Sequence, residues 1–176
     1  CVFTNARNQG TIELRKHWIG TPGTTTLGIH TLSVPSTLVD SQIVSDADGT
    51  TGQNIVNTGS YTLSESSLPD YMSSLSCFND LNNNGIDEKE PSVAVGTLDS
   101  VSVAKDDHII CTYTNTRKTG NLFIDKIISG GTATGNEWNF RLTTLSGGFI
   151  AIMKDMAGFN STTLDTGTYQ ISEAEG

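Results

Sequence analysis

Hydrophobic and polar residues alternate along this chain in short runs, the pattern of β-strands that bury one face. No segment keeps a helical period. Turn sequences such as Thr-Pro-Gly at 21–23 and Asn-Asn-Asn-Gly at 82–85 separate neighbouring runs. The pattern predicts an all-β chain of the sandwich type. The expected strands lie near 11–18, 25–34, 53–57, 60–65, 71–78, 92–95, 99–104 and 108–115, and then near 121–128, 137–143, 149–153 and 167–173.

The chain also repeats itself. Cys1-Val-Phe-Thr-Asn5 returns as Cys111-Thr-Tyr-Thr-Asn115, a shift of 110 positions. The heptapeptide 59–65 (Gly-Ser-Tyr-Thr-Leu-Ser-Glu) returns at 167–173 as Gly-Thr-Tyr-Gln-Ile-Ser-Glu, a shift of 108. A fixed period of this kind marks an array of similar units.

The period divides the chain into three parts. Residues 1–9 are expected to be the last strand of a preceding repeat, 10–119 a complete β-sandwich, and 120–176 the first half of a following repeat. Further chain, or another subunit that adds its own strands, would complete that half. We therefore expect the sequence to be a part of a longer tandem array.

Charge restricts the partners. Ten basic and nineteen acidic residues give a net charge of −9. A nucleic-acid-binding protein needs a basic surface, and an anionic membrane would repel this chain. No apolar run approaches the roughly 20 residues that span a bilayer. We expect no nucleic-acid partner and no membrane span in this segment.

Each apolar strand face carries one polar residue, because residues two apart point the same way. In the complete repeat these residues are Lys16, Glu65 and Asn115. A buried Lys or Glu is costly unless it is paired, so the three side chains are expected to meet. The partial repeats carry the same residue types at Lys126, Glu173 and Asn5.

The segment 59–71, Gly-Ser-Tyr-Thr-Leu-Ser-Glu-Ser-Ser-Leu-Pro-Asp-Tyr, resembles a motif of a known family. It is similar to the motif segment of the prealbumin-like (Cna B-type, SpaA-like) repeat domains of Gram-positive surface proteins and pilins. A lysine in the first strand and an asparagine in the last strand complete the resemblance. It implies tandem immunoglobulin-like, prealbumin-like β-sandwiches.

The resemblance also implies a reaction. In many members of the family the lysine attacks the asparagine carboxamide, ammonia leaves, and an intramolecular isopeptide bond forms with help from an acid. By position, Lys16 would be the nucleophile, Asn115 the acceptor and Glu65 the acid. Burial favours a neutral amine and a protonated acid, and fixed proximity favours the attack. The alternatives are a noncovalent buried set of the same three residues, or a Lys16 that reaches solvent at a strand end while Glu65 and Asn115 only hydrogen-bond.

The repeat accounts for the three cysteines. Cys77 and Cys111 fall within the complete repeat and are expected to form a disulfide, which implies an oxidising, extracytoplasmic compartment. Free buried thiols are the alternative. Cys1 would pair within a preceding repeat, or less simply would be a lipid-modified terminus.

The segment 80–88 resembles the start of a calcium loop, with oxygens at alternate positions and Gly85 at the sixth. The twelfth position is Pro91 where a glutamate belongs, and a polar Asn-Gly hairpin needs no metal. Both interpretations stay open. The candidate ligands are Asp80, Asn82, Asn84, Ile86 and Glu88.

The remaining candidates favour structure over catalysis. The histidines at 17, 30 and 108 show no metal spacing, and Trp18 is expected to pack in the core rather than to bind a ligand. Asn160-Ser-Thr matches a glycosylation sequon. The chain contains no nucleophile elbow, dinucleotide motif or P-loop. We expect no enzyme activity and, calcium apart, no cofactor.

Two functions follow. The first is a structural repeat unit of an extracellular surface stalk, pilus-like filament or adhesin, stabilised by crosslinks within the domain. The alternative is an adhesive module that recognises a glycan or protein through loops at the sandwich end. Both place the protein outside the cell or on its surface. The first also predicts self-association into a filament or array, with strand exchange as one route.

Overall fold

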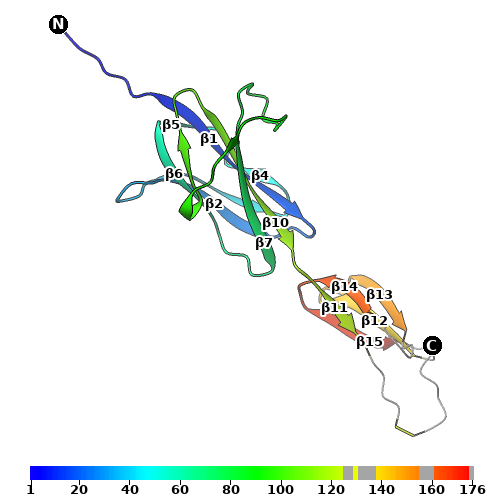
Figure 1. The fold of residues 1–176 in the computed structure, drawn as a ribbon. Coiled ribbons are helices and arrows are strands. Elements are labelled where there is room, and N and C mark those ends of the chain that lie inside the picture. The colour runs from blue at the N-terminus through cyan, green and yellow to red at the C-terminus, as the bar shows by residue number, and fades with distance from the viewer. Residues whose placement is uncertain (125–128, 131–137, 155–160, 175–176) are drawn as a thin grey trace. The chain divides into compact units, whose positions relative to one another are not determined.

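The computed structural model describes residues 1–124, 129–130, 138–154 and 161–174. The chain divides into two compact units, Cys1–Arg117 and Lys118–Gly176, which Figure 1 shows as two groups of strands. The regular structure described is all strand apart from one 3-10 turn, so the predicted all-β class is confirmed.

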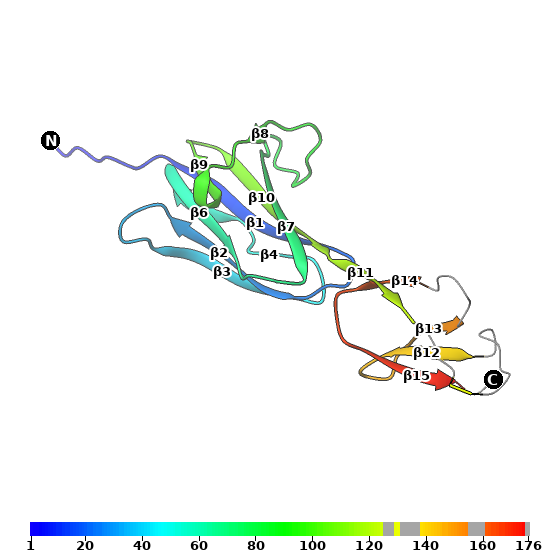
Figure 2. The ribbon, with the colours of Figure 1, turned by 60° about the horizontal axis from the view of Figure 1, so that its bottom comes forward.

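Unit 1 is a sandwich of two sheets (Figures 1 and 2). One sheet has the strand order β4-β1-β10-β7-β8, and β5 also pairs with β1; the other has the order β3-β2-β6-β9. The strands are β1 Gln9–Ile19, β2 Thr24–Thr31, β3 Leu38–Ser45, β4 Gly49–Thr50, β5 Asn54–Asn57, β6 Gly59–Glu65, β7 Tyr71–Asn79, β8 Ser92–Val93, β9 Ser100–Val103 and β10 His108–Arg117, with the 3-10 turn η1 at Thr97–Asp99.

The inner faces of the two sheets form one core. Ile12 and Leu14 of β1 meet Leu27 and Ile29 of β2 there, and all four side chains are completely buried. They are the residues that the period-2 alternation assigns to the inner face. Burial of each such side chain stabilises the fold by about 1.5–3 kcal/mol.

The first and last strands of unit 1 are neighbours. β1 pairs in parallel with β10, and this pairing places Leu14 opposite Cys111 and Trp18 opposite Asn115. On its other side β10 pairs antiparallel with β7, where Cys111 lies opposite Cys77. β10 is thus held between two strands that come from distant parts of the sequence.

Cys77 and Cys111 form the predicted disulfide across this β7–β10 ladder. Both cysteines are buried. Cys1 is a free, exposed cysteine. The thiol alternative for Cys77 and Cys111 is therefore wrong.

Unit 2 also contains two sheets, β11-β14 and β13-β12-β15. Its small core contains Phe140, Leu142 and Met153. Its strands are β11 Thr119–Phe123, β12 Asn139–Thr144, β13 Phe149–Lys154, β14 Ser161–Asp165 and β15 Tyr169–Ala174.

The repeated heptapeptide folds in the same way in both units. In unit 1 the hydroxyl of Tyr61 donates to the carbonyl of Asn57, and in unit 2 Tyr169 donates to the carbonyl of Asp165, each at 2.6 Å. The strand that follows pairs with corresponding partners, since Glu65 lies opposite Leu27 in β2 and Glu173 lies opposite Phe140 in β12.

Three strands were not expected: β3, β4 and β14. β3 is an edge strand in which only Val44 is buried. Such a strand lacks the alternation by which buried strands are found, because most of its side chains face solvent.

Residues 1–8 lie outside any strand and are exposed. The strand expected over 1–9 therefore does not form within this chain. Its assignment to a preceding repeat stays a prediction.

Loss of the disulfide is expected to destabilise unit 1. The bridged cysteines are 34 positions apart, a loop for which the chain-entropy model gives about 3–4 kcal/mol. Urea unfolding of a Cys77→Ala/Cys111→Ala variant measures the loss. The control is Cys1→Ala, which changes an exposed cysteine and should leave the midpoint in place. Equal midpoints for all three proteins would contradict the expectation.

Candidate covalent crosslinking site

Lys16 of β1 is among the largest completely enclosed side chains of the protein, with 0 % of its side chain exposed. Its Nζ lies 3.2 Å from Oε1 of Glu65. It donates to the carbonyls of Tyr113 and His17, each at 3.3 Å, and lies 4.1 Å from the centroid of the Trp18 ring. The amine is therefore held inside unit 1 and does not reach solvent.

Asn115 of β10 completes the arrangement and is 0 % exposed. Its Nδ2 donates to Oε1 of Glu65 at 2.9 Å, so one carboxyl oxygen contacts both the amine and the carboxamide. Among the described residues, Oδ1 of Asn115 has no hydrogen-bond partner. The structure brings Lys16, Glu65 and Asn115 together as a buried set.

The fold explains this meeting. Lys16 and Asn115 lie on adjacent parallel strands, two positions apart in register, since Trp18 is the residue opposite Asn115. Both belong to the inward-facing series of their strands. Glu65 ends β6 in the facing sheet. The acid thus approaches from one sheet, and the amine and carboxamide from the other.

Burial lowers the pKa of the Lys16 ammonium below its ordinary value, although the negative charges of Glu65 and Asp48 act in the opposite direction. A lowered pKa increases the fraction of neutral amine, which is the nucleophilic form. The environment therefore favours the form of Lys16 that could attack a carbonyl carbon.

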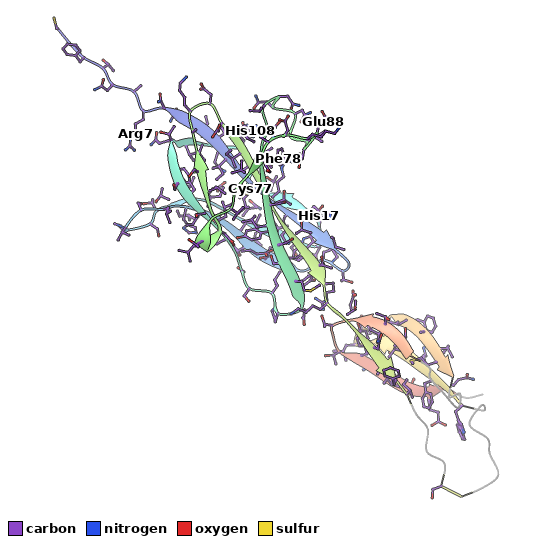
Figure 3. All side chains as sticks on the ribbon, in the orientation of Figure 1. Arg7, His17, Cys77, Phe78, Glu88 and His108 are labelled. Carbon is purple, nitrogen blue, oxygen red and sulfur yellow. A yellow bond between two sulfur atoms is a disulfide. The ribbon has the colours of Figure 1, made fainter. Side chains whose placement is uncertain are left out.

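Trp18 is part of the core, as predicted, and is held over Lys16 by the turn before β4. Asp48 accepts from the amide of Trp18 at 2.8 Å, and the indole nitrogen donates to the carbonyl of Ala47 at 2.8 Å. Burial raises the pKa of Asp48, but hydrogen bonds from His17 and the Trp18 amide outweigh this effect and hold it below its usual range. His17 is labelled in Figure 3.

A cavity of about 460 Å³ adjoins the set, and both Glu65 and Asn115 line it. The cavity wall includes Ser73, whose hydroxyl donates to Oε2 of Glu65 at 3.0 Å. Sequence reasoning missed Ser73. The one signal for it is its place four residues before Cys77 on the same face of β7.

Of the three candidate residues in the partial repeats, the structure describes two, Asn5 and Glu173. Lys126 lies outside the described residues. Glu173 is exposed on β15, and Asn5 is exposed outside any strand. Their roles in neighbouring repeats stay predictions.

The segment 80–88 uses its oxygens for its own backbone. Asp80 is 1 % exposed; its carboxylate accepts from the amides of Asn84 and Gly85 and lies 3.2 Å from Nδ1 of His108. The side chain of Asn84 donates to Glu88 and accepts from the amide of Ile86, and Asn82 also accepts from the Asn84 amide. Figure 3 labels Glu88 and His108.

Gly85 has a φ of 75°, the left-handed conformation that a turn here requires. Within the described part of the chain, no group of three or more His, Cys, Asp or Glu side chains could hold a metal. Calcium at this loop stays a prediction. The sequon residue Asn160 lies outside the described residues, and Trp138 is half-buried.

These features define a prealbumin-like β-sandwich with a buried amine–acid–carboxamide set. A family model of the SpaA type, described as a prealbumin-like fold domain, matches residues 2–117. The chain belongs to this family. The expected resemblance is confirmed.

The solved structure of the Bacillus anthracis TIE protein has the same fold. It is 15 % identical, with a TM-score of 0.58, and the match covers 96 % of this chain. This chain spans 29 % of the length of that structure. No curated protein matches the sequence.

The family assignment supports a structural role at a cell surface. Among the described residues, no helix is long and apolar enough to cross a membrane.

The unreacted unit is expected to become more stable with rising pH over the interval that ends near the ordinary lysine pKa of about 10. Because burial lowers the pKa of folded Lys16, the unfolded state binds more protons over this interval. The test compares Asn115→Ala, which keeps the amine but cannot crosslink, with Asn115→Ala/Lys16→Met, which lacks it. As pH rises, the free energy of unfolding of Asn115→Ala should increase relative to that of Asn115→Ala/Lys16→Met. A difference that is constant or moves the other way would contradict this.

Proposed function

We propose that this chain is a structural unit of an extracellular surface stalk or pilus-like filament, and that a Lys16–Asn115 isopeptide bond strengthens unit 1. The observation that carries the proposal is the buried contact of Glu65 with both the amine and the carboxamide. A charged lysine in this position is costly to bury. An amide made from the same atoms carries no charge.

The reaction needs only the groups present. The neutral Nζ of Lys16 attacks Cγ of Asn115, and the C–Nδ2 bond breaks. Oε1 of Glu65 lies 3.2 Å from Nζ and 2.9 Å from Nδ2, so it can accept a proton from the amine and deliver one to the departing nitrogen. One secondary amide forms and one ammonia leaves. Each site reacts once, so the unit is a crosslinked structure and not an enzyme that turns over.

The position of the bond suits a chain under tension. β1 and β10 are the first and last strands of unit 1 and pair in parallel. A bond between Lys16 and Asn115 would pass tension directly from one strand to the other, so the residues between them would bear none. The Cys77–Cys111 disulfide lies inside this interval. Tension along the chain would therefore not reach the disulfide or the core residues that lie between Lys16 and Asn115 in the sequence.

Family membership and composition support the same role. The prealbumin-like fold over residues 2–117, the internal repeat and the net charge of −9 fit a soluble, repetitive surface assembly. We propose self-association of such units into an array or filament, in an oxidising extracellular setting that keeps the disulfide formed.

Intact-mass measurement tests the bond. The folded protein is expected to be lighter than its sequence by one ammonia, and Lys16→Ala and Asn115→Ala are expected to have their full sequence masses. Glu65→Gln removes the proton carrier and should slow the loss of ammonia by about 100-fold or more. The masses should be measured with the disulfide reduced, which separates the two crosslinks. Full sequence mass in folded, undegraded wild-type protein would refute the proposal.

A further inference from the structure

β7 supplies a fourth polar side chain to the crosslinking site. Ser73 lies directly opposite Asn115 in the β7–β10 ladder. Its hydroxyl donates to Oε2 of Glu65 at 3.0 Å, whereas Oε1 contacts Lys16 and Asn115. The two oxygens of the carboxyl therefore have separate partners, one that holds the group and one that faces the reacting atoms.

The disulfide fixes the ladder that places Ser73. Cys77 and Cys111 lie opposite each other four residues from the Ser73–Asn115 pair. Residues an even number apart share a face, so the disulfide and Ser73 are on the same side of β7. A slip of one residue would turn Ser73 away from Glu65. The covalent bridge excludes that slip.

Glu65 needs a positioning contact because it borders open space. The carboxyl lines the cavity of about 460 Å³, and a glutamate side chain has several rotatable bonds. Without Ser73 the carboxyl can turn into the cavity, and Oε1 then leaves the space between the amine and the carboxamide. Proton transfer requires hydrogen-bond distances, and a displacement of about 1 Å can cost a factor of about 100 in rate.

We infer that Ser73 is a positioning residue of the crosslinking site: its hydroxyl holds Glu65 in the rotamer that transfers the proton. The inference rests on the proposed Lys16–Asn115 reaction. Ser73 is exposed while the Glu65 side chain is 7 % exposed. The serine therefore closes the outer side of the carboxyl without taking part in the chemistry.

The test measures the rate of ammonia loss in chains made by cell-free translation. Samples are quenched at intervals, and their intact masses are measured. Ser73→Ala is expected to crosslink about tenfold more slowly than wild type, because the carboxyl is less often in place. Ser73→Thr keeps the hydroxyl and should restore most of the rate. The matched control is Ser74→Ala, the next serine of β7, whose hydroxyl donates instead to the carbonyl of Thr114 at 3.5 Å.

A second measurement separates positioning from stability. In the Lys16→Ala background, which cannot crosslink, Ser73→Ala should leave the urea midpoint of unit 1 unchanged. Equal rates for Ser73→Ala and wild type overturn the inference while the proposed function stands. Equal slowing by Ser73→Ala and Ser74→Ala, or failure of Ser73→Thr to recover the rate, also overturns it. If the wild type loses no ammonia, the proposed function itself fails.

Discussion

The buried amine of Lys16 is the group on which the other polar contacts of this site depend. Lys16 is enclosed by Trp18, Tyr113 and Glu65, and a positive charge there costs several kcal/mol unless an opposite charge compensates it. Glu65 offers that compensation from the facing sheet. The same contact places the acid within hydrogen-bond distance of the Asn115 carboxamide. The interaction that makes the lysine tolerable is therefore also the one that could convert it to an uncharged amide.

Strand β10 is the element on which the other constraints meet. It pairs in parallel with β1 and antiparallel with β7. The disulfide joins it to β7 through Cys111, and Asn115, on the same face, donates to Glu65 of the facing sheet. Because inward-facing residues repeat every second position, a single strand supplies one cysteine of the disulfide, part of the core and the Asn115 carboxamide.

The repeated segments show how closely local sequence sets local structure. Tyr61 and Tyr169 make the same hydrogen bond to a carbonyl four residues earlier, in turns whose sequences are closely similar, Asn-Thr-Gly-Ser-Tyr at 57–61 and Asp-Thr-Gly-Thr-Tyr at 165–169. The glutamate that follows each tyrosine takes the corresponding place in its ladder, opposite Leu27 in one unit and Phe140 in the other. Similar sequence over 57–65 and 165–173 is thus accompanied by the same turn and by corresponding strand pairing.

The sequence by itself determined the strand class, the alternation that buries Ile12 and Leu14, and the cysteine pair, because these depend on period and repeat. It also placed Lys16, Glu65 and Asn115 on apolar faces. Only the tertiary structure decided that one carboxyl oxygen touches both other groups, that Ser73 holds the second oxygen, and that the solvated edge strand β3 exists. Those features depend on strand register and on which sheets face each other. The contacts of Glu65 with Lys16 and with Asn115 join residues 49 and 50 positions apart, and no local pattern in the sequence sets their atomic geometry.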